Sequence, residues 1–368
     1  MIRNSTLALV LTVFTLLSCS KVQVVKQKDQ EELNAEAANQ NDQKILEVWK
    51  DTHAEELIKL SEKVVRVAVS KNDEAIYTIT YSGKSTDITA FEIKNKKVAN
   101  TSSFSDQPRR NTFRIRNGTA SFVTWIPHPI HEKRDSSLIE VDLSDFKINK
   151  YVNDMKKHDW FFRGYDKSPT KSQGLIVDDT GNVSSWDFHQ AKTDWVNEDL
   201  NSVLIFDNKP HVFYSEDGKL AIATASIVDY IVVIDAHSGD TLYIIPTSEG
   251  ISSISLSSDN STLAYAIKNS KLVIHELPNK NEINVLRTNK SIDFLEFTAN
   301  NKCLVACDSR GQVSVLDVYS GDYLISFQAN KGWVEQLNLS PKSSFGVSSG
   351  PSNELSIWDL PFQCKDEL

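Results

Sequence analysis

The residues that could do chemistry are few and scattered along this chain of 368 residues. The eight histidines are widely spread, and His128 and His131 form the best candidate metal pair. No third ligand lies near them, so we expect no zinc or other metal site. The motifs of serine hydrolases, zinc peptidases, P-loop nucleotidases and dinucleotide-binding folds are all missing. The sequence therefore predicts no catalytic residue, no cofactor and no small-molecule substrate.

The four cysteines, Cys19, Cys303, Cys307 and Cys364, are too few for a disulfide framework. Cys303 and Cys307 lie four residues apart in a predicted strand, where they would share a face at roughly 13 Å. That separation is too large for a bridge. We expect Cys303 and Cys307 to be small buried apolar residues.

The net charge of −9 argues against a nucleic-acid partner, because the phosphate backbone requires a basic surface. The densest basic segment contains Arg109, Arg110, Arg114 and Arg116, with Asp106 beside it. This mixture predicts a solvated strand face.

The N-terminus reads as an export signal. Arg3 precedes an apolar run from Leu7 to Leu17, which is short for a membrane span and typical of a signal peptide. Cleavage after Ser20 is one outcome. The alternative is that "LLSC", Leu16 to Cys19, resembles the bacterial lipobox, which implies acylation of Cys19 and cleavage before it. Under the lipoprotein reading, residues 1–18 are the signal peptide and residues 19–43 a polar, flexible tether.

The last residues, Lys365 to Leu368, compete with that reading. They spell "KDEL" and resemble the retrieval signal of soluble proteins in the endoplasmic reticulum lumen. Six Asn-x-Ser/Thr sequons after the leader suit that compartment too. We favour a lipid-anchored protein of the cell or outer membrane, facing the periplasm or the surface, and keep the reticulum lumen as the alternative.

Downstream of the tether the chain repeats with a period of about 40 residues. Each unit reads as four short alternating strands joined by polar turns. The first strands of seven units are expected near Val64, Asn111, His158, His211, Ile251, Ile292 and Trp333.

Two short signatures recur in these units. "S-x-D-G/N" precedes the second strand at Ser215–Gly218 and Ser257–Asn260. The third strand ends on an acidic residue, and in two units this residue follows a tryptophan. The positions are Glu92, Asp142, Trp186-Asp187, Asp235, Glu276, Asp317 and Trp358-Asp359. These units resemble the WD-repeat family. The resemblance implies an all-β, seven-bladed β-propeller over residues 44–362, followed by a tail at 363–368; an eight-bladed quinoprotein-like propeller is the alternative.

The seventh unit ends after its third strand, so closing the ring requires a strand from elsewhere. Glu56–Leu60 is the candidate, because an unpaired edge would otherwise be exposed. The rival reading makes residues 44–62 an amphipathic helix. Many WD repeats also carry a Gly-His pair before the first strand, whose histidine bonds an aspartate in a later turn. No unit here has that pair, although Asp179 and Asp308 keep the turn aspartate, so we expect an incomplete network and blades held by apolar packing.

With no catalytic constellation, the surface is left to carry the function. A propeller of this kind implies a non-enzymatic scaffold for protein–protein interaction, with other envelope proteins as partners and the lipid anchor as the membrane attachment. Aromatic residues in the irregular first half are the candidate contacts: Trp125, Trp160, Phe161, Phe162 and Trp195. Residues 158–166 could instead be a first strand packed in the core. A soluble luminal propeller and a propeller enzyme of the lactonase or quinoprotein type are the alternative functions.

Overall fold

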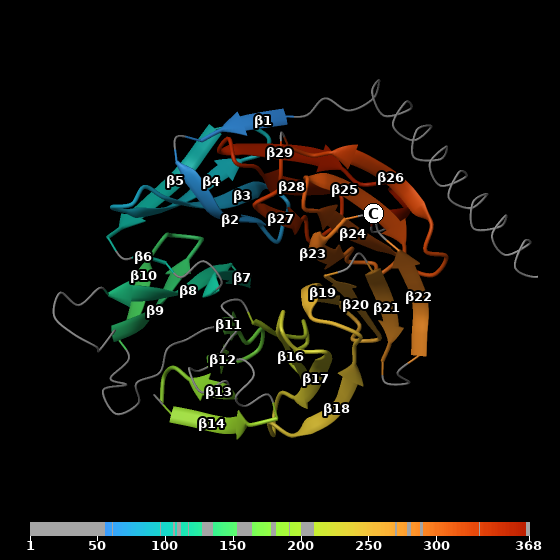
Figure 1. The fold of residues 1–368 in the computed structure, drawn as a ribbon. Helices are drawn as coiled ribbons and strands as arrows, with labels where there is room; N and C mark the ends of the chain where they lie inside the picture. The colour runs from blue at the N-terminus through green and yellow to red at the C-terminus, as the bar shows by residue number, and fades with distance from the viewer. Residues whose placement is uncertain are drawn as a thin grey trace, which may run out of the picture. The chain divides into compact units, whose positions relative to one another are not determined.

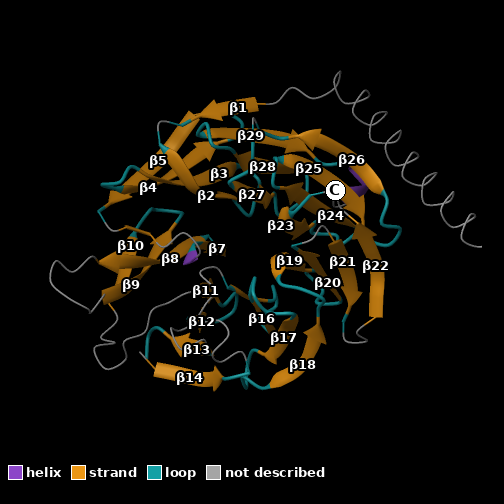
Figure 2. Cartoon of the chain, viewed as in Figure 1, coloured by secondary structure: helices purple, strands orange, loops and turns teal. Residues whose placement is uncertain are grey.

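The computed structural model describes residues 56–365, except 61, 96, 106, 109–111, 117, 127–134, 153–163, 178–181, 191, 200–209, 269–270, 278–280, 288–289 and 331. Among these residues the chain is almost entirely β-strand (Figure 2). Seven antiparallel sheets are arranged in a ring, so the fold is a seven-bladed β-propeller, as the sequence predicted (Figure 1). The signal peptide and the tether predicted for residues 1–43 lie outside the described residues.

The blades follow one another along the chain. Blade 1 contains β2 (Lys63–Val69), β3 (Ala75–Tyr81), β4 (Thr86–Glu92) and β5 (Lys97–Phe104). Blade 2 contains β6 (Gln107–Pro108), β7 (Arg114–Arg116), β8 (Thr119–Ile126), β9 (Asp135–Asp142) and β10 (Ile148–Val152). Blade 3 contains β11 (Gly164–Lys167), β12 (Gln173–Val177), β13 (Val183–Asp187) and β14 (Lys192–Asn197). Blade 4 contains β15 (His211–Tyr214), β16 (Leu220–Thr224), β17 (Tyr230–Asp235) and β18 (Thr241–Pro246).

The later blades are the most regular. Blade 5 contains β19 (Ile251–Leu256), β20 (Thr262–Ile267), β21 (Lys271–Glu276) and β22 (Asn281–Arg287). Blade 6 contains β23 (Ile292–Phe297), β24 (Cys303–Asp308), β25 (Gln312–Asp317) and β26 (Tyr323–Gln328). Blade 7 contains β27 (Gln336–Leu339), β28 (Phe345–Ser349) and β29 (Glu354–Asp359), and its fourth strand is β1 (Glu56–Lys59). The first strand of each blade, or β7 in blade 2, is called the inner strand below and lies nearest the ring axis (Figure 1).

Strand β1 closes the ring. It pairs antiparallel with β29, from Glu56 opposite Ile357 to Lys59 opposite Glu354. Ile58 packs into the apolar cluster shared by blades 7 and 1. The predicted closing strand is therefore confirmed, and the helical alternative is wrong for residues 56–59; its remainder, 44–55, lies outside the described residues.

The core is divided among the junctions between blades. Six clusters of buried side chains each combine two consecutive blades. Strands β20 and β24 are buried at every position, since both of their faces are covered. The outermost strands β14 and β18 have many exposed positions, because they form the rim of the ring.

The acidic residues that close the third strands stand where the sequence placed them: each of the seven third strands ends on one. Several of them cap the turn that follows. The Asp235 carboxylate accepts the amides of His237 and Ser238 at 2.8 and 3.0 Å, and Asp187 and Asp317 accept amides two and three residues on in the same way. The backbone amides of Ser238 and His237 lower the pKa of Asp235. These residues are turn-forming groups.

The "S-x-D-G/N" signature shapes the turn between the first and second strands. In blade 4 the Ser215 hydroxyl donates to Asp217 at 2.8 Å and accepts the Leu220 amide at 2.9 Å. Gly218 has a φ of 73°, the left-handed conformation that glycine adopts without strain. The same turn recurs with other residues at the left-handed position: Asp73, Asn260, Asn301 and Ser343.

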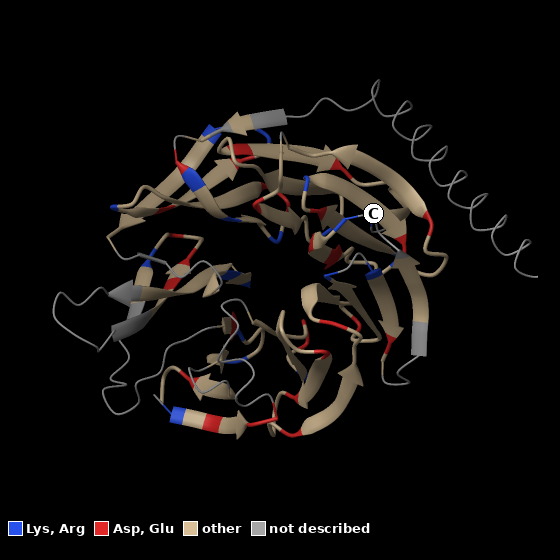
Figure 3. Cartoon of the chain, in the orientation of Figure 1, with Lys and Arg blue, Asp and Glu red and all other residues tan. Residues whose placement is uncertain are grey.

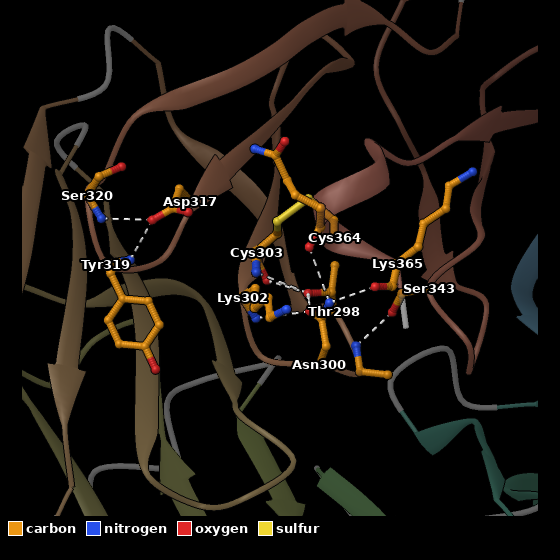
Figure 4. Close-up of a disulfide and its surroundings, with 12 residues drawn as sticks. Thr298, Asn300, Lys302, Cys303, Asp317, Tyr319, Ser320, Ser343, Cys364 and Lys365 are labelled. Atoms are coloured by element: carbon orange, nitrogen blue, oxygen red, sulfur yellow. Dashed lines mark hydrogen bonds between the residues drawn. A yellow bond between two sulfur atoms is a disulfide. The ribbon is translucent and has the colours of Figure 1, made fainter. Parts of the chain in front are cut away.

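One cysteine prediction is wrong. Cys303 is not a free buried thiol: it forms a disulfide with Cys364, with Cα atoms 5.4 Å apart (Figure 4). Cys364 ends the short 3-10 turn η3 (Phe362–Cys364), which follows the last strand and returns onto blade 6. The sequence did not reveal this pairing because Cys364 lies outside the repeats. Cys307 is free and buried, as expected.

The prediction for the basic segment is also wrong for Arg114 and Arg116. Both are half-buried and are paired with Asp166 of the neighbouring blade. The pairing was hidden because roughly 50 residues separate the partners in sequence. Arg109 and Arg110 lie outside the described residues.

Candidate interaction surface and the polar axis of the ring

A repeated hydrogen bond fastens one inner strand to the next. The side chain of the penultimate residue of an inner strand accepts the backbone amide of the last residue of the following inner strand. Four of the seven junctions have it: Asp166 with Tyr214 (2.7 Å), Ser255 with Phe297 (3.3 Å), Glu296 with Leu339 (3.2 Å) and Asn338 with Val69 (2.9 Å). We call this contact the inner clasp.

Blades 2, 3 and 4 are held by charge as well. The fully buried Asp166 accepts Nε of Arg114 at 2.8 Å and a terminal nitrogen of Arg116 at 3.1 Å. Arg116 reaches past blade 3 to the carbonyl oxygen of Tyr214 at 3.0 Å. Because a buried carboxylate is stable only when its charge and lone pairs are satisfied, these contacts and the Tyr214 amide account for its burial. The basic segment of β7 lies on the inner side of the ring (Figure 3).

A second polar group lies where blades 6, 7 and 1 meet. A terminal nitrogen of Arg66 donates to Oε1 of Gln336 at 3.1 Å, and Nδ2 of Asn338 donates to Oε1 of Glu296 at 3.2 Å. Burial lowers the pKa of Arg66 to about 10, with a further contribution from the positive charge of Arg114. Burial raises the pKa of Glu296 to about 8, although the Leu339 amide and Arg66 act in the opposite direction. Glu296 is therefore protonated at neutral pH.

The turns after the first and third strands of every blade emerge on the same side of the ring, which we call the turn face. Neighbouring turns on this face are bonded to each other across blades 5 to 1. Asn301 accepts the Ser258 amide at 2.9 Å, and the Ser343 hydroxyl accepts the Ala299 amide at 2.6 Å. The Ser344 hydroxyl donates to Asp73 at 2.9 Å. The turn face is therefore a connected surface with fixed geometry.

Two aromatic side chains project from the turn face close to the disulfide. Tyr319 is 73% exposed and follows Asp317, whose carboxylate accepts the Tyr319 amide at 3.0 Å (Figure 4). Phe362 is 91% exposed and begins the turn that ends at Cys364. Cys303, the partner of Cys364, lies directly opposite Asp317 in the sheet. The side chain of Asn300 donates to the carbonyl oxygens of Gln363 and Lys365 at 3.3 and 2.9 Å, which fixes the turn further.

The aromatic residues that the sequence nominated do not form this surface. Trp195 is only 9% exposed, because its indole packs against Gly239 and donates to the carbonyl oxygen of Ala236 at 3.1 Å. The prediction that Trp195 is an exposed contact residue is therefore wrong. Trp125 lies on β8, but its side chain is outside the described residues, as are Trp160, Phe161 and Phe162. Tyr319 and Phe362 were missed; the sequence signal for Tyr319 is its place directly after a strand-closing aspartate.

Substitutes for the missing Gly-His network are present in two blades. In blade 7 the Trp358 indole donates to the Ser348 hydroxyl at 3.3 Å, and this hydroxyl donates to Asn330 at 2.7 Å. In blade 6 Lys290 lies just before the inner strand and pairs with the turn residue Asp308 at 2.9 Å. Asn330 and Lys290 thus take the place of the histidine, so in these two blades a polar network adds to the expected apolar packing.

Residues 254–341 match the family described as the anaphase-promoting complex subunit 4 WD40 domain. This segment runs from β19 to just beyond β27, the most regular part of the ring. Together with the seven blades, the match shows that the chain is a WD-repeat-like β-propeller. No curated protein matches the chain.

In the described part of the chain no group of three or more His, Cys, Asp or Glu side chains is placed to hold a metal ion. The same residues include no helix that is long and apolar enough to cross a membrane.

We predict that Asp166→Asn destabilises the domain by about 3–5 kcal/mol, because Arg114 and Arg116 lose their shared counter-charge inside the ring. Urea unfolding followed by tryptophan fluorescence measures the change. Asp322→Asn, on an exposed turn of blade 6, is the matched control and should have little effect. Equal stabilities of the two variants would contradict the assigned role of Asp166.

Glu296 makes stability depend on pH. Its folded-state pKa of about 8 exceeds the ordinary value of 4.5, so between these values the folded chain holds a proton that the unfolded chain has lost. The free energy of unfolding therefore falls as pH rises from about 4.5 to 8. We predict that Glu296→Gln reduces this fall by at least about 1 kcal/mol between pH 5 and pH 8. Urea unfolding at a series of pH values measures the free energy of unfolding, and the exposed Glu198→Gln is the control. If this free energy changes with pH in the same way in the wild type and in Glu296→Gln, the prediction is refuted.

Proposed function

We propose that the chain is a non-enzymatic interaction scaffold, a propeller tethered by lipid on Cys19 to a membrane of the cell envelope, where it binds other envelope proteins. The observation that carries the proposal is the pair of exposed aromatic residues, Tyr319 and Phe362, on a part of the turn face fixed by a disulfide and by hydrogen bonds. Exposed aromatic side chains on rigid supports are typical binding hot spots, since they bury a large area with little loss of conformational entropy.

The disulfide supports export of the domain. Bonds such as Cys303–Cys364 form and persist mainly in oxidising compartments, outside the cytosol. The two locations suggested by the sequence, the cell envelope and the reticulum lumen, both lie outside the cytosol. Cys19 lies outside the described residues, so its acylation rests on the likeness of "LLSC" to a lipobox.

The attachment of Lys365 favours the lipoprotein over the retained luminal protein. A retrieval signal has to enter a receptor as a free peptide end. Here Lys365, the first residue of "KDEL", follows the disulfide-bonded Cys364 directly, and its carbonyl oxygen is bonded to Asn300. Only three residues of the motif follow that bond.

The anchor is tested by metabolic labelling with palmitate in a bacterial host. We predict that the wild-type chain incorporates the label and fractionates with membranes, and that Cys19→Ala loses both properties. Cys307→Ala, which removes the free cysteine of blade 6, should retain both. Absence of label from the wild-type chain would end the lipoprotein assignment. Secretion from eukaryotic cells only after deletion of Lys365–Leu368 would favour the luminal alternative.

The scaffold role is tested with Tyr319→Ser/Phe362→Ser. We predict that the double change weakens association with envelope partners by at least about tenfold, because two hot-spot side chains are removed. The measurement is quantitative cross-linking in intact cells followed by affinity purification. Leu242→Ser/Ile244→Ser on the rim strand β18 is the control, since it removes two exposed apolar side chains (47% and 44% exposed) elsewhere on the ring. An equal loss in both variants would refute the assignment of the turn face.

A further inference from the structure

Arg66 carries a positive charge near the ring axis without a carboxylate bonded to it. It lies on the inner strand β2 and is half-buried. Within the described part of the chain its guanidinium makes one hydrogen bond, to Oε1 of Gln336 at 3.1 Å. A guanidinium has five N–H donors in a planar fork, so most of its donor capacity is unused by the protein.

The acidic groups nearest to Arg66 are already committed. Asp166 is shared by Arg114 and Arg116 and also accepts the Tyr214 amide. Glu296 accepts hydrogen bonds from Asn338 and Leu339, and its raised pKa keeps it uncharged at neutral pH. Asp166 is therefore occupied by Arg114 and Arg116, and within the described residues no carboxylate is bonded to Arg66.

Burial, and after it the like charge of Arg114, lowers the pKa of Arg66, whereas Glu296 and Asp166 act in the opposite direction. A half-buried guanidinium whose donors are mostly unused is stabilised by an anion that accepts from them. The unused donors thus favour a negatively charged ligand beside Arg66.

Gln336 supplies a second donor next to this charge. Its Oε1 accepts from Arg66, so the amide nitrogen of the same side chain points its two N–H groups elsewhere. Arg66 belongs to blade 1 and Gln336 to blade 7, on adjacent inner strands that the inner clasp between Asn338 and Val69 holds together. A planar guanidinium and a neighbouring amide form a donor set that matches the oxygens of an oxyanion.

We propose that Arg66 and Gln336 form a binding site for a small oxyanion, a phosphate or a carboxylate, beside the ring axis where blade 7 meets blade 1. The site is independent of the turn face and of the membrane anchor. Its occupancy would couple a small anionic ligand to the junction that closes the ring.

The test is calorimetric titration of the full-length protein with inorganic phosphate and, separately, with succinate, both at constant ionic strength set by sodium chloride. We expect saturable binding of at least one of the two. Binding of phosphate alone identifies a phosphoryl ligand, and binding of succinate alone identifies a carboxylate. No heat beyond the chloride background for either anion would overturn the proposal.

Variants assign any binding to the named residues. We expect Arg66→Gln to weaken it at least tenfold, since a charge-assisted hydrogen bond is lost, while Arg310→Gln on an exposed turn leaves it unchanged. Gln336→Glu places a carboxylate against Arg66 and should abolish binding without lowering the thermal unfolding temperature, so the test stands even if Arg66→Gln fails to fold. Wild-type affinity in Gln336→Glu or in a folded Arg66→Gln would refute the site.

Discussion

The structure depends on the closure of the ring by β1. The apolar clusters each join two consecutive blades, so an unclosed ring would leave β29 as an open edge and one apolar sheet face uncovered. The contacts across this seam are polar as well as apolar: Lys63 pairs with Glu335 at 2.6 Å, Asn338 accepts the Val69 amide, and Ser344 bonds Asp73. These contacts, and the hydrogen bond from Arg66 to Gln336, join blade 1 to blade 7 at the junction beside the β1–β29 pairing.

The other end of the described chain is fastened by a different means. After β29 the chain forms the turn Phe362–Cys364, which is held to blade 6 by the disulfide and by Asn300. A covalent link between positions 61 residues apart removes much of the freedom of the unfolded chain. It also fixes the backbone beside Phe362, so an exposed aromatic residue is presented by a rigid segment. Stability and the proposed binding surface are thus tied to the same bond.

What the sequence could predict is local. The acidic residues from Glu92 to Asp359 were placed correctly because the signature is local: Asp142, Asp187, Asp235 and Asp317 each accept backbone amides within three residues of themselves. The closing strand was predictable because the seventh unit lacked one. The disulfide was not predictable, because it joins a repeat to a residue outside all repeats. Trp195 was misjudged because residue type alone does not reveal the close approach of Gly239.

The arginine cluster was hidden for a related reason, and it explains why the first half of the chain departs from the repeat. The strand pairings align blade 2 with blade 1: Thr119 pairs with Asp142 in the same way that Ala75 pairs with Glu92. In this alignment Ser121 corresponds to Tyr77. Arg114, which pairs with Ser121, therefore corresponds to Ala68, which pairs with Tyr77. That place is the penultimate position of the inner clasp, where blades 3, 5, 6 and 7 have an acceptor. Arg114 is a donor there, and it bonds Asp166, the acceptor at the same position of the next blade. A neutral contact between neighbours is replaced by an ion pair that extends through Arg116 to blade 4. Blades 2 and 3 therefore keep a side-chain link between neighbouring inner strands, although their sequence signatures diverge from the repeat.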